Sequence, residues 1–265
     1  MNIIDLTPEF EQLYFVCLED WSDEMKEAGS HKARWYESMK KNGLRVKLAA
    51  DDNGNIGGMI QYLPIEHSFA AGNDMYVILC IWVHGHKEGR GDFTGKGMGQ
   101  ALLKAAEDDV REMGKKGIVA WGVTLPFFMR ASWFKKHEYK KVDREGITAL
   151  LWKSFSPDAV APTLILKKKN PEKNKNKVSV DAFMSGWCPA SNIVFERARR
   201  ASETFGDSIE FKYYDTSDIN IFQEWGIKDA LYINGIEIST GPPPSYEKIY
   251  GIIDKQIKRL GKRGK

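Results

Sequence analysis

Hydrophobic positions in the first 165 residues follow two spacings, one typical of strands and the other of helices. MYVILCIWV, at residues 75–83, is apolar on both faces and predicts a strand at the centre of a sheet. GIVAWGVTL, at residues 117–125, predicts a second buried strand. Between them a helix is expected over residues 97–113, because apolar side chains recur there at helical period, at Met98, Leu102, Leu103, Ala106, Val110 and Met113. The other elements expected in this part are strands at residues 2–6, 44–51, 56–63, 148–153 and 163–166, and helices at residues 8–21, 32–41 and 130–137.

A lysine-rich stretch, KKKNPEKNKNK at residues 167–177, separates this part from the rest of the chain. It has no apolar residue and cannot bury itself, so it predicts a solvated linker; a basic patch for an acidic ligand is the alternative. We therefore expect two domains, residues 1–168 and 178–265, joined by a linker at residues 169–177. In the second domain the pattern predicts strands at 178–185 and 208–215, helices at 189–204, 217–225 and 245–260, and a hairpin with the type I′ turn Asn234-Gly235.

Composition narrows the class of protein. The chain has 265 residues, 42% of them hydrophobic, and a formal net charge of only +3, which argues for neither a nucleic-acid nor a membrane partner. No apolar run approaches the roughly 20 residues of a membrane helix, and the first residues lack the order of a signal peptide. Three scattered cysteines do not form a disulfide framework, so we expect a reduced, cytoplasmic protein.

A glycine-rich loop lies between the central strand and the amphipathic helix, HGHKEGRGDFTGKGMGQALL. Such a loop leaves backbone N–H groups unpaired at the positive end of a helix, where phosphate oxygens bind. The loop lacks the Gly-Lys-Ser/Thr of a Walker motif and does not fit a dinucleotide fingerprint. An ordinary strand-to-helix turn is the alternative interpretation.

The wider order, an apolar strand, this loop, a long helix, a second apolar strand and then A-x-W-F-K-K-x-E-Y, resembles the GNAT superfamily of acetyl-CoA-dependent N-acetyltransferases over about residues 1–168. The resemblance implies an α/β (α+β) fold with a mixed, mostly antiparallel sheet and flanking helices. It also implies acetyl-CoA as co-substrate, with the pyrophosphate on the loop amides and pantetheine along the central strand. The cofactor-binding residues that it implies are Ile81, Val83, Thr94, Gly95, Lys96, Gly97, Met98, Gly99 and Gln100. Thr94 departs from the family, which usually has Gln or Arg there.

The same resemblance calls for a base that deprotonates the amine and an acid that meets the leaving thiolate, while a backbone amide polarises the carbonyl. The family's tyrosine acid aligns with Phe134, which has no proton to give. The substitutes considered as acids are Tyr139, Cys80, His84 and Ser132. The candidate bases are Glu66, His67 and His84. Trp82, Trp121 and Trp133 suggest an aromatic acceptor pocket, with core packing as the alternative.

The second domain resembles the thioredoxin fold, and specifically the YoaP-like domains attached to GNAT domains, over about residues 178–260. Its motif is Cys188-Pro189-Ala190-Ser191, so the second thiol of a C-x-x-C pair is absent and Cys188 with Ser191 is at most a monothiol site. Asp229 stands where the family has a cis-proline, and we expect its peptide bond to be trans. We expect no metal.

These inferences together predict transfer of an acetyl group to the amine of a small molecule, with a protein acceptor as second choice. The alternative is a monothiol thioredoxin-like protein acting through Cys188, with the GNAT-like domain as a CoA-binding sensor. A third interpretation makes the second domain a dimerisation or substrate-capping module, so a homodimer is a candidate assembly.

Overall fold

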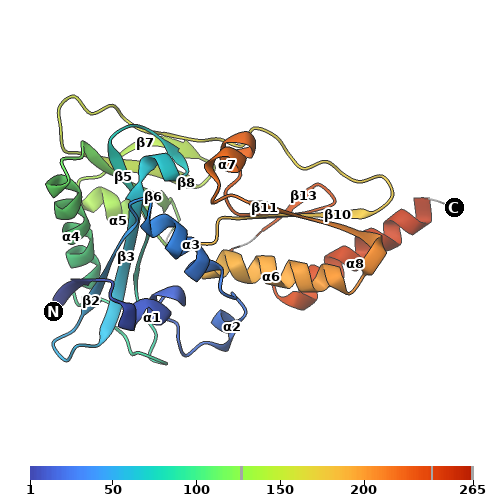
Figure 1. Cartoon of the computed structure of the whole chain (residues 1–265), viewed down its shortest axis with the longest axis horizontal. Helices are drawn as coiled ribbons and strands as arrows, with labels where there is room; N and C mark the ends of the chain where they lie inside the picture. The colour runs from blue at the N-terminus through green and yellow to red at the C-terminus, as the bar shows by residue number, and fades with distance from the viewer. Residues whose placement is uncertain (126–127, 240, 264–265) are drawn as a thin grey trace. The chain divides into compact units, whose positions relative to one another are not determined.

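The structure is a computed structural model that describes residues 1–125, 128–239 and 241–263 (Figure 1). The chain divides into two compact units. The N-terminal unit comprises Met1–Ser22 and Tyr36–Ile165, and the C-terminal unit comprises Asp23–Trp35 and Leu166–Lys265. The division after Ile165 falls close to the expected boundary near residue 168. The sequence pattern did not indicate that Asp23–Trp35 belongs to the C-terminal unit.

A seven-stranded mixed sheet forms the N-terminal unit, in the order β1-β2-β3-β5-β6-β8-β7. Every neighbouring pair in it is antiparallel except β5 and β6, which are parallel. Its strands are β1 (Asn2–Asp5), β2 (Arg45–Ala50), β3 (Ile56–Pro64), β5 (Met75–Val83), β6 (Gly117–Val123), β7 (Lys140–Glu145) and β8 (Thr148–Ser154). A separate small sheet pairs β4 (Ala70–Ala71) with β9 (Thr163–Leu164).

The helix α4 (Met98–Glu112) packs its apolar stripe against one face of the large sheet (Figure 1). The short helix α5 (Ala131–Lys136) contributes Phe134 to the same core. The remaining short elements are η1 (Pro8–Phe10), α1 (Glu11–Phe15), α2 (Asp23–Lys26), α3 (His31–Lys40) and η2 (Ile65–His67). Among the described residues, no helix is both long enough and apolar enough to cross a membrane.

The parallel pair β5 and β6 separates after a short stretch. The two strands pair from Met75 with Gly117 to Ile78 with Ala120. Beyond that point β6 continues to pair with β8, and Val123 also forms a single bridge with Arg130. A register shift between β3 and β5 also falls here, since Tyr62 pairs with Ile78 but the preceding Gln61 pairs with Cys80. The indole Nε1 of Trp121 donates a hydrogen bond to the carbonyl oxygen of Leu79 at 2.8 Å, which joins the strands where they part. The sheet therefore opens at the carboxyl ends of β5 and β6.

The structure of the N-terminal unit differs from the sequence-based expectation at a helix and at a strand. The helix expected over residues 8–21 stops at Phe15, because Cys17 and Leu18 adopt positive φ angles and the Leu18 N–H bonds back to Leu13. The sequence has no glycine or asparagine there that would have predicted residues with positive φ. The strand β7 was not predicted, because its sequence KKVDRE is charged, as is typical of a strand at the edge of a sheet.

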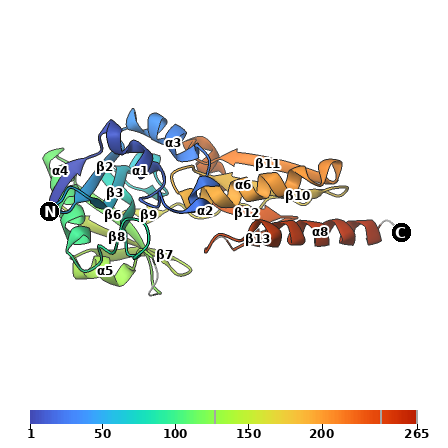
Figure 2. The same cartoon turned by 90° about the horizontal axis from the view of Figure 1, so that it is seen from below.

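The C-terminal unit contains a four-stranded sheet in the order β11-β10-β12-β13, with α6 and α8 packed together on one face (Figures 1 and 2). The pair β10·β11 is parallel, and the other two pairs are antiparallel. Phe183, Tyr214, Trp225 and Tyr232 cluster on the other face, where α7 lies. Its elements are β10 (Val178–Met184), α6 (Pro189–Glu203), η3 (Gly206–Ser208), β11 (Ile209–Asp215), α7 (Ile219–Trp225), β12 (Ala230–Ile233), β13 (Ile236–Ile238) and α8 (Tyr246–Arg263).

Both residues of the predicted Asn234-Gly235 turn have positive φ, 52° and 70°, as a type I′ hairpin requires. The lysine-rich stretch, in contrast, is not simply solvated. Its Lys168 N–H bonds to the Trp225 carbonyl at 2.8 Å, Pro171 is buried, and Asn174 donates to Glu210 at 3.0 Å. These contacts attach the stretch to its own unit, although most of its charged side chains remain exposed.

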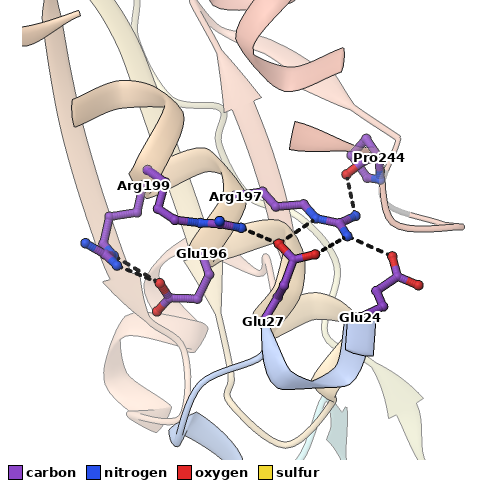
Figure 3. Close-up of polar contacts among 7 residues, drawn as sticks. Glu24, Glu27, Glu196, Arg197, Arg199 and Pro244 are labelled. Atoms are coloured by element: carbon purple, nitrogen blue, oxygen red, sulfur yellow. Dashed lines mark hydrogen bonds and ion pairs between the residues drawn. The ribbon is translucent and has the colours of Figure 1, made fainter. Parts of the chain in front are cut away.

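Asp23–Trp35 is held in the C-terminal unit by the buried side chain of Arg197 on α6 (Figure 3). The guanidinium donates to Glu24 at 2.9 Å, to Glu27 at 2.7 Å and to the Pro244 carbonyl at 3.0 Å. The Arg197 hydrogen bond is the main cause that holds the pKa of Glu27 below its ordinary value. The residue before Arg197 on α6, Glu196, is hydrogen-bonded through its carboxylate to the imidazole Nε2 of His31 at 2.7 Å. These contacts make the segment an integral part of the unit.

Replacing Arg197 with alanine should release this segment, because the Glu24 and Glu27 carboxylates lose their buried partner. We expect faster hydrogen exchange across residues 23–30 and a loss of about 1–3 kcal/mol in the free energy of unfolding. The control is Arg199→Ala, since Arg199 pairs only with Glu196 and Glu203 among the carboxylates of the described residues. Equal exchange in both variants would show that Arg197 does not hold the segment.

Candidate active site

A cleft of about 460 Å³ lies where β5 leaves β6. Its walls come from the end of β5, the glycine-rich loop, the first turn of α4, and the segment leading into α5. The described residues that line it are Ile81, Trp82, Val83, Phe93, Thr94, Gly95, Gly97, Met98, Gly99, Gln100, Phe128, Met129, Arg130, Trp133, Phe134 and His137. Eight of the nine residues predicted to bind the cofactor are among them. The ninth, Lys96, places its ammonium 4.8 Å from the centre of the Phe93 ring.

The glycine-rich loop enters α4 through two left-handed residues. Gly95 and Gly97 have φ angles of 70° and 82°, which a residue with a side chain rarely adopts. Gly97 is the N-cap of α4 and has no side chain to cap the helix, so the first-turn N–H groups are available to a ligand. Asp92 fixes the entry to the loop by accepting hydrogen bonds from the Thr94 hydroxyl and N–H, at 2.6 and 2.8 Å, and these bonds lower the pKa of Asp92.

His84 is fully buried and does not line the cleft. Its Nε2 accepts a hydrogen bond from the Trp21 indole at 3.0 Å, and its Nδ1 lies 2.8 Å from the Gly91 carbonyl oxygen. Because an indole only donates and a carbonyl only accepts, these two bonds require a proton on Nδ1 and a free lone pair on Nε2, and the Glu19 carboxylate lies 3.8 Å from Nε2. Neither nitrogen is open to a substrate, which disfavours the predicted acid–base role.

Glu66 and His67 lie at the opposite end of β5 from the cleft. They are exposed in η2, directly after Pro64, which pairs with Tyr76 near the start of β5. The strand rises by seven residue steps from Tyr76 to Val83, which is about 23 Å. This distance from the cleft disfavours both residues as bases. They were proposed because the sequence does not indicate at which end of the strand the sheet opens.

The predicted acids also lie outside the cleft lining. Cys80 is buried on β5 and points to the face opposite that of Ile81, as alternation along a strand requires. Burial, together with the Glu107 carboxylate, raises the pKa of Tyr139 well above its ordinary value, and its ring packs on Phe134 in the core. Ser132 is exposed on α5. Phe134 itself lines the cleft, so the position matched to the family's tyrosine does face it.

Several lining residues were not proposed from the sequence. They are Phe93 in the loop, Phe128, Met129 and Arg130 before α5, and His137 directly after it. Arg130 brings a positive charge to the cleft, and His137 packs against Trp133 with ring centres 4.5 Å apart. The sequence signal that could have indicated these residues is Arg130-x-x-Trp133, at the start of a helix that follows a buried strand. Among the described residues, no group of three His, Cys, Asp or Glu side chains could hold a metal ion.

Three comparisons relate the chain to known proteins. Residues 6–137 match the model of the acetyltransferase (GNAT) family. No curated protein matches the chain. Among solved structures it is similar to a GNAT family acetyltransferase from Brucella melitensis in complex with acetyl-CoA, at 15% identity, covering 60% of this chain and 90% of that one with a TM-score of 0.41. For a GNAT family N-acetyltransferase from Escherichia coli in complex with CoA these values are 13%, 62%, 88% and 0.44. For the PaiA N-acetyltransferase from Thermoplasma acidophilum in complex with coenzyme A they are 18%, 58%, 100% and 0.41.

The family model spans the strands, the glycine-rich loop and the helix α5 that build the cleft. The chain therefore carries a GNAT acetyltransferase domain over residues 6–137, and the protein is an acetyltransferase.

Proposed function

We propose that the protein transfers the acetyl group of acetyl-CoA to the amine of a small molecule, and that the cleft at the end of β5 is where the two substrates meet. The observation that carries the proposal is the uncapped first turn of α4, reached through two left-handed glycines at the wall of the cleft. The Thr94 N–H is already bonded to Asp92, so the pyrophosphate cradle begins after it. Arg130 adds a positive charge for the phosphates.

The separation of β5 from β6 supports a place for pantetheine. Beyond Ile78, the edge of β5 that faces β6 has no partner strand. An extended ligand with amide groups can pair with such an edge as an added strand would. Ile81 and Val83, which lie on this part of β5, also line the cleft. The thioester would then lie near the point where the strands part.

The reaction is attack of a neutral amine on the thioester carbonyl. A carbon–nitrogen bond forms, the carbon–sulfur bond breaks, and the amine proton passes to a base while CoA leaves as the thiolate. A thiol titrates about 8.5, so its thiolate leaves without strong acid assistance. This fits a cleft that has Phe134 where the family has a tyrosine, with solvent protonating the thiolate.

His84 serves in this proposal as a positioning residue. Its two hydrogen bonds fix Trp21 on one side and Gly91, in the loop before the cofactor cradle, on the other. Its backbone adds to this, since the His84 carbonyl accepts from the Phe93 N–H at 2.9 Å. The side chain thus holds the loop that leads to the phosphate site.

We propose that the C-terminal unit is a thioredoxin-like domain with no internal dithiol chemistry. The support is its strand order, with a parallel pair followed by an antiparallel hairpin, and Cys188 as N-cap of α6. None of the three cysteines is in a disulfide. The peptide bond before Asp229 is trans, and its carboxylate accepts from the Ser185 N–H and hydroxyl at 2.8 and 2.9 Å. The family match makes acetyl transfer the first function, and monothiol chemistry at Cys188 would be an addition to it.

Gly97→Ala tests the phosphate cradle. A Cβ at Gly97 has no atom within 4 Å, so alanine introduces strain of about 1–3 kcal/mol but no clash. We expect the Kd of acetyl-CoA, measured by isothermal titration calorimetry, to rise at least tenfold. Gly54→Ala is the matched control, with φ of 84°, equally open space, and a place in the turn between β2 and β3. Unchanged affinity in Gly97→Ala would contradict the cradle.

His84→Ala separates positioning from proton transfer. A lost general base lowers kcat by roughly 10²–10⁴-fold and removes a limb of the pH profile. We expect instead a raised KM for acetyl-CoA and a lowered thermal midpoint, with the shape of the kcat–pH profile retained. His67→Ala, at the far end of β5, should change none of these. A lost limb in His84→Ala would restore the base assignment.

Asp229→Asn tests the buried carboxylate that accepts hydrogen bonds from Ser185. Burial raises the pKa of Asp229 above 3.8 in the folded protein, against the lowering effects of Lys228 and Ser185. The protonated Asp229 therefore contributes its full share to the free energy of unfolding below the pKa that it has in the unfolded chain. This contribution is lost as the pH rises through the pKa that Asp229 has in the folded protein. Relative to Asp229→Asn, the wild type should lose about 1.4 kcal/mol for each pH unit between these two values.

Urea unfolding of both proteins between pH 3.5 and 8 measures this difference. Asp207→Asn, which neutralises an exposed carboxylate in η3, is the control and should show no such trend. A wild type that gains stability over the variant with rising pH would mean that the Ser185 hydrogen bonds outweigh burial.

A further inference from the structure

The cleft has an aromatic wall, which we define as Trp82, Trp121 and Phe128. The Phe128 ring lies 5.8 Å from that of Trp82 and 6.1 Å from that of Trp121, centre to centre. Trp82 and Phe128 line the cleft directly. Along β5, the Trp82 side chain alternates with those of Ile81 and Val83. Trp121 packs, as Ile81 and Val83 do, against the core under α4. Trp82 and Phe128 are therefore the part of the wall that a ligand in the cleft can reach.

Packing alone does not account for this wall. Phe128 is 42% exposed although its ring contacts two indoles. Exposed apolar side chains that are scattered singly are ordinary, but a cluster at the mouth of a catalytic cleft indicates a ligand surface. The Trp82 indole N–H is buried without a hydrogen-bond partner among the described residues, whereas the Trp121 indole donates to Leu79. A buried donor without a partner points to an acceptor atom that a ligand or water supplies.

The charge of the cleft restricts the class of amine. Its described lining contains Arg130 and His137 but no carboxylate. The nearest acidic side chain in the loop, Asp92, is bonded to Thr94, and Asp20 at the far side of the insertion pairs with Arg90. The additional ammonium groups of a polyamine would find no carboxylate to pair with in the described lining.

We propose that the acceptor is a monoamine carried on an aromatic ring, an arylalkylamine in chemical class; this rests on the proposed acetyl transfer. The ring packs against Trp82 and Phe128, as aromatic pairs do in offset or edge-to-face contact. The amine then extends toward the point where β5 leaves β6 and attacks the thioester there. Neutral amine is consumed, N-acetylated amine and CoA thiol are released, and no other co-reactant is required.

An acceptor panel tests the proposal, with release of CoA thiol from acetyl-CoA as the readout. The panel contains 2-phenylethylamine and tryptamine, the matched saturated amine 2-cyclohexylethylamine, hexylamine and spermidine. We expect kcat/KM for the two aromatic amines to exceed that for hexylamine and spermidine by at least tenfold, and that for the cyclohexyl amine by severalfold. Equal rates across the panel, a preference for spermidine, or no turnover of the aromatic amines would each overturn the proposal.

Phe128→Ala connects the preference to the wall. It should raise the KM for 2-phenylethylamine about tenfold and leave the Kd of acetyl-CoA within twofold. Leu125→Ala is the control, because Leu125 is equally exposed at 45%, lies three residues earlier and does not line the cleft. Equal KM values in the two variants would remove Phe128 from the acceptor site.

Calorimetry with acetyl-CoA on the same full-length protein distinguishes the two levels of failure. If acetyl-CoA does not bind, the proposed function fails and the acceptor class fails with it. If acetyl-CoA binds and only aliphatic amines release CoA, the acetyl transfer stands and the aromatic class is wrong.

Discussion

The early end of the pairing between β5 and β6 is the constraint on which the site depends. The strands are parallel neighbours for four residues, from Met75 to Ile78, and then diverge. Divergence removes the hydrogen-bond partners of the β5 edge inside the sheet, which is costly unless other groups replace them. The Trp121 indole replaces one of them at Leu79. In the proposed function, the other positions along this edge are those with which an extended co-substrate would pair.

At the end of β5, where β6 has diverged, consecutive side chains make different contacts. On one side, Ile81 and Val83 continue the apolar contact with α4, which brings the uncapped helix start near the strand. On the other, Trp82 has no such partner and joins the aromatic wall. In the proposed function, Ile81 and Val83 would contact the co-substrate and Trp82 the acceptor, so consecutive residues of one strand would serve the two substrates.

The sequence could predict what short-range physics determines. The apolar run of β5, the stripe of α4, the glycine positions and the Asn234-Gly235 turn all follow from local rules, and the structure has each of them. The catalytic candidates were weaker because their merit depends on long-range pairing. Glu66 is near the central strand in sequence but lies beyond the wrong end of it, since β3 runs antiparallel to β5. His84 lies at the right end, but its nitrogens are occupied by Trp21 and Gly91, which no spacing rule connects.

The feature that the sequence predicted least well is the assignment of Asp23–Trp35 to the C-terminal unit. The family match covers residues 6–137 without interruption, yet Asp23–Trp35 within it clusters with the C-terminal unit. Arg197 and Glu196 on α6 hold that segment by ion pairs, and Gly186 brings its backbone against Trp35, where a Cβ would come within 3.2 Å. A cut at residue 168 would therefore remove the partners of Glu27 and His31 and uncover Trp35, which is 6% exposed. The C-terminal unit therefore includes α2 and the first half of α3 in addition to the residues that follow the lysine-rich stretch.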